Sequence, residues 1–341
     1  MTWKRFAVEQ AKAVSYSLDS QNIDFWHVFA SIAQSESLLF RIAGNMVHAT
    51  SSLELIQCSA PMDKRMNSTS GYIAIQRSLN CIQVEDLSNA ENSLKAWTPL
   101  AYEHTSLLER VVMSRKHMML GRILRLEGAF EQSRLELKRA EEIMNEHNEL
   151  NFEEDLRDFT CDYADTLREL DDLEAAEFLL RAEIMRRDRN SISDKSLLEL
   201  ALAEVLFAQG RFEDAEHLCS IIESRGDLLK FGRLRLLVTM AKLQHLQSAK
   251  EDALSRWTGA MGEIGQFPLT NGYTTRIIML SIAELVGGGI EDEVEKAVRM
   301  TSLEKVDTLG KNARPGGTKN WIAGLCQWAE SRGFADVLNE P

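Results

Sequence analysis

The chain has 341 residues, of which 44% are hydrophobic and 27% charged, a composition typical of globular rather than disordered proteins. The 52 acidic residues outnumber the 39 basic ones and give a net charge of −13. This balance disfavours non-specific binding to nucleic acid or to an anionic membrane.

The five cysteines are odd in number, and none of them forms a Cys-x-x-Cys pair. This usage favours reduced thiols in a cytosolic protein over a disulfide framework or a metal site. The first residues run into charged side chains without an apolar core, so no secretory signal is expected. No uncharged run reaches about 18 residues, so no transmembrane helix is expected either. The predicted location is therefore cytoplasmic.

Residues 1–60 are predicted to be helical, because apolar side chains recur at near-helical spacing. The stripes are Trp3, Phe6, Val14 and Leu18; Phe25, Val28, Phe29 and Ile32; and Leu39, Ile42 and Met46. Ser51 and Glu54 have the spacing of a capping box that opens a short helix. Polar composition predicts exposed loops over residues 61–71, 265–272 and 310–318.

A repeated pattern occupies the middle of the chain. Around Gly128, small residues fall at Gly121, Ser133 and Ala140, and large apolar residues fall between them. Similar patterns surround four other turns, at Glu85, Asp171, Gly210 and Ser248. The steps between successive turns are 43, 43, 39 and 38 residues. Each pattern predicts two amphipathic helices joined by a tight turn, with small residues where the helices touch.

This pattern resembles the tetratricopeptide repeat, with steps longer than the roughly 34 residues of the standard unit. The resemblance implies an all-α fold, a right-handed superhelical α-solenoid of antiparallel helix pairs. We expect residues 1–60 to form a helical cap, residues 72–262 the repeats, and residues 263–341 degenerate repeats with a capping helix. Terminal repeats are often atypical because one of their faces meets water.

No short catalytic or metal-binding motif is present. The histidines show neither the His-x-x-x-His nor the His-Glu-x-x-His spacing, and there is no Gly-x-Ser-x-Gly elbow or phosphate-binding loop. We therefore expect no metal and no cofactor, and we assign no catalytic residue. The residues around Gly310 and Lys311 are interpreted as a basic loop, with anion binding as the lesser alternative.

The resemblance implies that the first helix of each pair lines a concave groove. The candidate groove residues are Arg115, Met118, Arg122, Arg125, Asp165, Arg168, Glu204, Phe207, Lys242 and His245. Arg115, Arg122 and Arg125 share one helical face and would concentrate positive charge there. Two interpretations stay open: these arginines contact a ligand, or they pair with acidic residues of the next repeat.

The favoured function is a non-catalytic scaffold that binds a partner peptide or protein of acidic character in the groove. One alternative is a regulatory module that senses a small molecule or peptide. Another is an atypical isomerase- or cyclase-like enzyme with its pocket in the concave face, using His117, Asp165, Glu204 or His245 as acid–base groups. The last alternative needs no short motif, so the enzyme question stays open.

Overall fold

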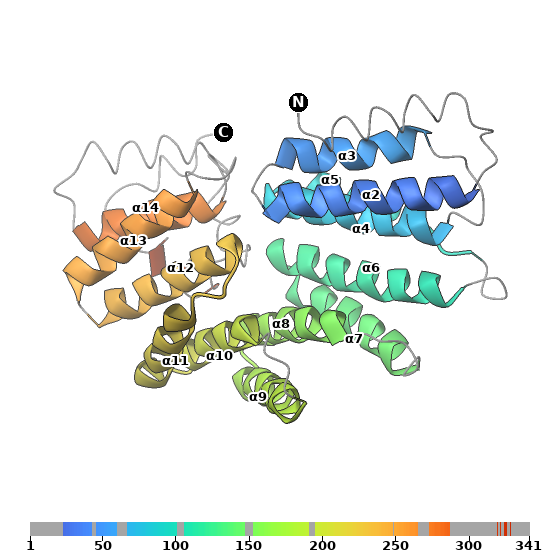
Figure 1. The fold of residues 1–341 in the computed structure, drawn as a ribbon. Coiled ribbons are helices and arrows are strands. Elements are labelled where there is room, and N and C mark those ends of the chain that lie inside the picture. The colour runs from blue at the N-terminus through green and yellow to red at the C-terminus, as the bar shows by residue number, and fades with distance from the viewer. Residues whose placement is uncertain are drawn as a thin grey trace. The chain divides into compact units, whose positions relative to one another are not determined.

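The computed structural model describes residues 23–42, 46–59, 67–100, 106–146, 153–190, 195–247, 249–264 and 273–286, with Lys319, Trp321, Gly324, Leu325 and Trp328. All regular elements in this part of the chain are α-helices, which confirms the all-α prediction (Figure 1). They are α2 (Ile23–Ile42), α3 (Met46–Ser59), α4 (Asn67–Gln83), α5 (Leu87–Lys95), α6 (Leu107–Leu126), α7 (Phe130–Glu146), α8 (Glu153–Glu169), α9 (Leu173–Arg189), α10 (Ser196–Ala208), α11 (Phe212–Arg225), α12 (Lys230–Leu246), α13 (Lys250–Ile264) and α14 (Tyr273–Val286).

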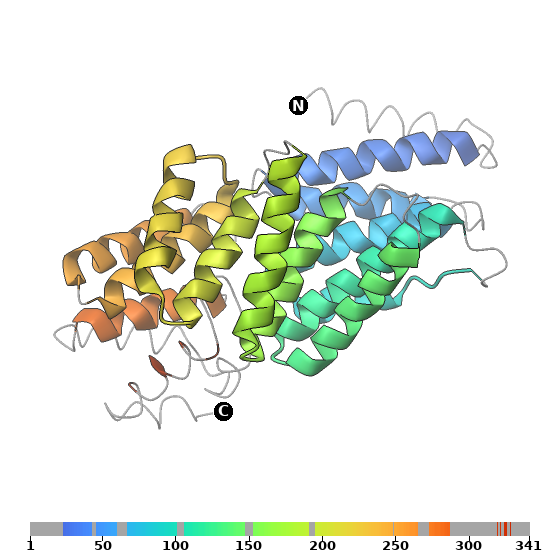
Figure 2. The same cartoon turned by 90° about the horizontal axis from the view of Figure 1, so that it is seen from below.

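The chain forms two compact units, Met1–Lys116 and His117–Pro341. In the first unit, α2 packs on α3 and α4, and α4 pairs with α5. In the second unit, α8 pairs with α9, α10 with α11 and α12 with α13, and these helices lie side by side (Figure 2). The first helices of these pairs also contact one another, α8 with α10 and α10 with α12. We call α8, α10 and α12 the first-helix row.

The predicted turns share one backbone geometry. Glu85, Gly128, Asp171 and Gly210 all adopt positive φ, between 63° and 80°. In each turn the residue that follows donates its N–H to a carbonyl five positions earlier: Asp86 to Cys81, Ala129 to Leu124, Asp172 to Leu167 and Arg211 to Leu206, at 2.8–2.9 Å. The same bond joins Ala249 to Gln244 across the fifth predicted turn, at 3.0 Å. This is the Schellman ending of a helix, and its recurrence confirms the repeat.

Small residues bring the paired helices together, as the sequence predicted. A Cβ atom added to Gly121 would lie 2.7 Å from Leu137 Cγ, closer than real side chains approach. Ser133 is fully buried, and its hydroxyl donates to the carbonyl of Gly121 at 2.7 Å. A larger residue at either position would push α6 and α7 apart.

Long helices contribute to the long repeat step. α6 has 20 residues and α7, α8 and α9 have 17 each, whereas α10 and α11 have 13 and 14. The two steps of 43 residues span residues 85–171 and contain α5 to α8. The second of them combines the 17-residue helices α7 and α8, whereas the first combines the 20-residue α6 with the 9-residue α5.

The core of the second unit is centred on α10. Every residue from Leu198 to Leu206 is buried, and their side chains pack with those of α8, α9, α11 and α12. A helix that is apolar on all sides has to be covered on all sides. This burial explains why α10 shows little amphipathic pattern.

Two local predictions were wrong. Ser51 lies inside α3, which begins at Met46, so Ser51 and Glu54 do not open a helix. The predicted loop 61–71 extends too far along the chain, because α4 already begins at Asn67. Gly71 is buried in this helix, against Trp97 and Val112. Its Asn-Ser-Thr-Ser-Gly sequence is turn-like by composition, and tertiary packing overrides that preference.

Several predictions concern residues outside those that the structure describes: the stripe from Trp3 to Leu18, the loops 265–272 and 310–318, and the fifth turn residue Ser248. The division into cap, repeats and degenerate repeats stays a prediction. Ile32 and Leu39, two predicted stripe residues, are 48% and 50% exposed.

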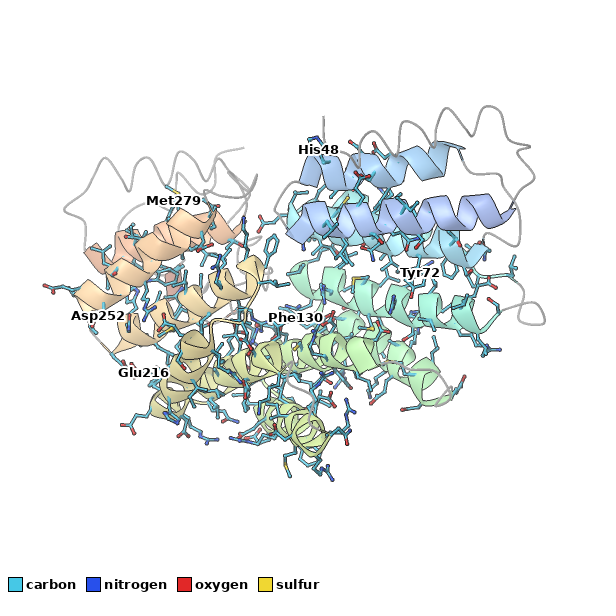
Figure 3. The ribbon with its side chains drawn as sticks, viewed as in Figure 1. His48, Tyr72, Phe130, Glu216, Asp252 and Met279 are labelled. Atoms are coloured by element: carbon cyan, nitrogen blue, oxygen red, sulfur yellow. The ribbon has the colours of Figure 1, made fainter. Side chains whose placement is uncertain are left out.

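Some polar side chains of the second helices face outward. Figure 3 shows Asp252, in the first turn of α13, pointing away from the helices of the second unit, and this residue is exposed. Over the described residues, no helix combines the length and the apolar character that a membrane span requires.

Candidate functional site

Charged side chains of the second unit meet along the first-helix row. On α8, Asp158, Asp162, Asp165 and Glu169 recur at intervals of three or four residues and so share one helical face. The two middle carboxylates meet arginines from α6 on one side and from α12 on the other. The sequence spacing therefore places the carboxylates on one face of α8, and the packing of the helices brings the arginines to that face.

The predicted anchors Arg122 and Arg125 are paired within the protein. Arg122 donates to both carboxylate oxygens of Asp162, at 2.7–3.0 Å, in a forked arrangement. Arg125 donates to Asp162 at 3.0 Å and lies 3.7 Å from Asp165. The interpretation that these arginines pair with acids of the next repeat is thus the one that the contacts support, with Asp162 as the main partner.

A second part of the network joins α8, α10 and α12. Arg235 donates to Asp165 and to Glu204, each at 2.7 Å, and Arg168 donates to the same two carboxylates. Glu169 accepts a further bond from Arg168 at 3.1 Å. The four arginines of the network, Arg122, Arg125, Arg168 and Arg235, thus face four carboxylates, those of Asp162, Asp165, Glu169 and Glu204.

This pairing fixes the charge state of the buried carboxylates. Burial raises the pKa of Asp165, but the charges of Arg235, Arg168 and Arg125 more than offset this and leave its pKa below the ordinary value. Burial also raises the pKa of Glu204, but the charges of Arg235 and Arg168 outweigh this and hold its pKa well below the ordinary value. Both groups stay ionised at neutral pH, which suits ion pairing and does not suit a general base.

Two predicted groove residues lie apart from this network. Arg115 belongs to the first unit, where it donates to the Tyr72 hydroxyl and lies over the Tyr72 ring, 4.9 Å from its centroid. Met118 is buried in the core at 2% exposure. The remaining three predicted residues, Phe207, Lys242 and His245, lie together around Trp321.

Trp321 is the centre of an aromatic cluster. Its ring lies 5.4 Å from His245, 6.1 Å from Trp257 and 6.5 Å from Phe207, and its indole N–H donates to Ser281 Oγ at 3.1 Å. Phe207 also contacts Phe212, at 5.6 Å between the ring centroids. These contacts join α10, α11, α12, α13 and α14 to a residue near the C-terminus.

Lys242 lies beside this cluster with its charge poorly compensated. Its ammonium lies 5.8 Å from the ring centroids of both Phe207 and Trp321, and only 3% of the residue is exposed. Burial lowers its pKa to about 8, in spite of the nearby charge of Glu204. No carboxylate of the described residues forms an ion pair with it.

A pocket of about 390 Å³ opens where α8, α10 and α12 end. Its walls include Phe207, Phe212, Trp321, His245, Glu284 and Lys319. Lys319 bridges to the turn after α8, because its backbone N–H donates to Glu169 at 2.9 Å and its ammonium to Asp171 at 2.6 Å. Concave sites of this size, with aromatic walls and polar groups that converge on them, are typical of ligand pockets.

Sequence reasoning missed several of these residues. Asp162 has the same helical spacing as the predicted groove residues, so the register contained the signal. The sequence contains no signal for Trp321 and Glu284, because only the fold brings α14 and the C-terminal residues beside α12. Among the described residues, no group of three or more metal-ligating side chains is arranged to hold an ion.

Cys161 and Cys219 show no sign of activation. Burial raises the pKa of Cys161 and raises that of Cys219 to about 12. A thiol with a raised pKa is a poor nucleophile, because the thiolate is the reactive form.

No protein-family model matches the sequence, and no curated protein matches it. Among solved structures, a Rap protein complexed with Competence and Sporulation Factor is similar, with a TM-score of 0.68. The match covers 98% of this chain and 90% of that chain at 8% sequence identity. The fold is a tetratricopeptide-like helical solenoid. At this identity the likeness concerns the fold and leaves the site to be argued from its own residues.

Proposed function

We propose that this chain is a non-catalytic scaffold that binds a peptide, or a peptide-like segment of a partner protein, against α8, α10 and α12. The observation that carries the proposal is the pocket at the ends of these helices, with aromatic walls and a poorly compensated Lys242 beside it. The similar Rap protein is complexed with a factor, which supports a binding role for this kind of solenoid.

We also propose that the partner segment is acidic. Arg122 and Arg125 are already paired with Asp162, so an acidic ligand would have to compete with that carboxylate. Lys242 is the better candidate, because a ligand carboxylate near its ammonium would relieve the burial that lowers its pKa.

The same pocket suits the alternative of a regulatory module that senses a small molecule or a short peptide, since its volume accommodates either. The enzyme alternative gains no support from Asp165 and Glu204, because both are held ionised by arginines. His117 is engaged with Glu136, at 2.7 Å.

A peptide screen tests the proposal. The purified full-length chain is titrated with a library of short fluorescent peptides, and the tightest binder is measured by fluorescence anisotropy. Phe207→Ala removes a pocket wall and is expected to weaken binding by about tenfold or more. Phe178→Ala is the matched control, because Phe178 is 76% exposed on α9, away from the first-helix row.

Circular dichroism of both variants verifies that they are folded. The proposal fails if no peptide binds, or if the two phenylalanine variants bind the selected peptide as tightly as the wild type does.

A further inference from the structure

Among the described charged residues that line the pocket, one forms no ion pair with an arginine or a lysine. Arg168 pairs with Asp165, Glu169 and Glu204, and Lys319 pairs with Asp171. Glu284, from α14, is the exception among the described charged residues of the pocket wall. Its nearest basic group in this part of the chain is His245, whose Nε2 lies 3.6 Å from Glu284 Oε2.

His245 does not supply the missing positive charge at neutral pH. Burial, followed by the charge of Lys250, lowers the pKa of this imidazole below its ordinary value. His245 is also largely enclosed, with 11% of its side chain exposed, and its ring contacts Trp321 edge to face. Glu284 therefore faces a neutral imidazole across a distance too long for a strong hydrogen bond.

The environment of the Glu284 carboxylate favours binding of a cation. A third of its side chain is exposed, so a ligand can reach it from the pocket. Burial of the rest raises its pKa. A positive charge in contact would favour the ionised form and offset the lost hydration.

The walls around Glu284 suit a cation that is attached to an apolar body. Phe207, Phe212 and Trp321 line the same pocket, and aromatic faces attract ammonium groups through their quadrupoles. The ammonium of Lys242 lies 5.8 Å from the ring centroids of both Phe207 and Trp321, so a cation is already found beside these rings. Nearby Glu204 and Glu169 offset part of the charge of Lys242, although neither forms an ion pair with it.

We propose that the pocket binds an organic ammonium group, with Glu284 as its countercharge and the rings of Phe207, Phe212 and Trp321 around its apolar part. Two sources share this chemistry, the amino group of a peptide ligand and a small free amine. The inference concerns the pocket of the proposed function and deepens it, because it states which chemical group occupies the pocket.

Calorimetry with defined probes tests the proposal on the full-length chain. Phenethylammonium is compared with 2-phenylethanol, which has a similar shape and no charge. The peptide Phe-Gly-Gly-Gly is compared with its N-acetylated form. We expect each charged probe to bind about tenfold or more tightly than its uncharged counterpart, as a hydrogen-bonded charge contact allows.

Variants assign the effect to Glu284. Glu284→Gln keeps the size of the side chain and removes its charge, and it is expected to remove the preference for the charged probes. Glu223→Gln is the matched control, because Glu223 pairs with Arg256 across α11 and α13, outside the pocket wall. It is expected to leave the preference unchanged.

The outcomes separate the two sources and the two proposals. Preference for the free-amine peptide alone assigns the site to a peptide terminus, and preference for phenethylammonium alone assigns it to a small amine. Equal binding of charged and uncharged probes, no binding of any probe, or an unchanged preference in Glu284→Gln overturns the inference. One further outcome is a peptide from the screen that loses affinity in Phe207→Ala but binds equally well when its amino group is acetylated. That result would support the proposed function and contradict the ammonium site.

Discussion

At the scale of single residues, the second unit buries an unusual amount of charge along the first-helix row. Most of it is compensated: Asp162 holds two arginines, and Asp165 and Glu204 share Arg168 and Arg235. Buried pairs of this kind add little net stability, but removal of one partner is costly because it leaves the other charge buried alone.

Arg235→Gln is therefore expected to lower the free energy of unfolding by about 3 kcal/mol. The side chain is 16% exposed, and its loss leaves Asp165 and Glu204 with fewer positive neighbours. Urea denaturation measures the change. Arg256→Gln is the control, because the Arg256–Glu223 pair lies at the surface, and we expect a loss below about 1 kcal/mol there. Equal losses in the two variants would contradict the importance of the network.

Lys242 is predicted to destabilise the folded protein at neutral pH. Its pKa is about 8 when folded, below the ordinary lysine value of 10.5, so the unfolded chain binds more protons between these values. The destabilisation is present in full below pH 8 and disappears as the pH rises toward 10.5.

Lys242→Met should consequently raise the free energy of unfolding at pH 7 by about 1–2 kcal/mol, after allowance for the lost contact with the aromatic rings. Denaturation of both proteins at a series of pH values measures the difference. We expect the advantage of Lys242→Met to shrink above pH 8. An advantage that does not depend on pH would mean that packing, and not charge, is responsible.

At the scale of elements, the recurring turn is the clearest link between sequence and structure. Gly210 has φ of +77°, and a Cβ atom there would meet nothing within 4 Å, so the backbone alone disfavours a side chain. Gly262 likewise has open space around it, but it lies inside helix α13.

The same substitution is therefore expected to have opposite effects at the two positions. Gly210→Ala should destabilise the protein by about 1 kcal/mol through the left-handed backbone. Gly262→Ala should stabilise it by about 0.5–1 kcal/mol through helix propensity. Thermal unfolding of both variants is the measurement, and a loss of stability at Gly262 would contradict this assignment of α13.

The turns were predictable because each lies between two patterns of period near 3.6, and even the non-glycine turn residues Glu85 and Asp171 were found by position. The start of α3 was not predictable from Ser51 and Glu54, since a capping box is a short pattern that also occurs inside helices. The pocket was not predictable because Trp321 reaches α12 only through tertiary packing, 76 residues beyond His245 in the sequence.

At the scale of the whole molecule, the predicted all-α solenoid is confirmed, and the proposed binding function belongs to the second unit. Arg122, Arg125 and Arg168 are paired inside that unit. We therefore propose that a ligand contacts the predicted groove near Phe207, Lys242 and His245. Binding is therefore expected to involve the C-terminal ends of α10 and α12 more than α6.

Hydrogen–deuterium exchange of the full-length chain, with and without the peptide selected in the screen, tests this account most directly. We predict that bound peptide protects the amides at the C-terminal ends of α10 and α12 and in α14. Protection confined to the first unit, or to the outer helices α9 and α11, would contradict it.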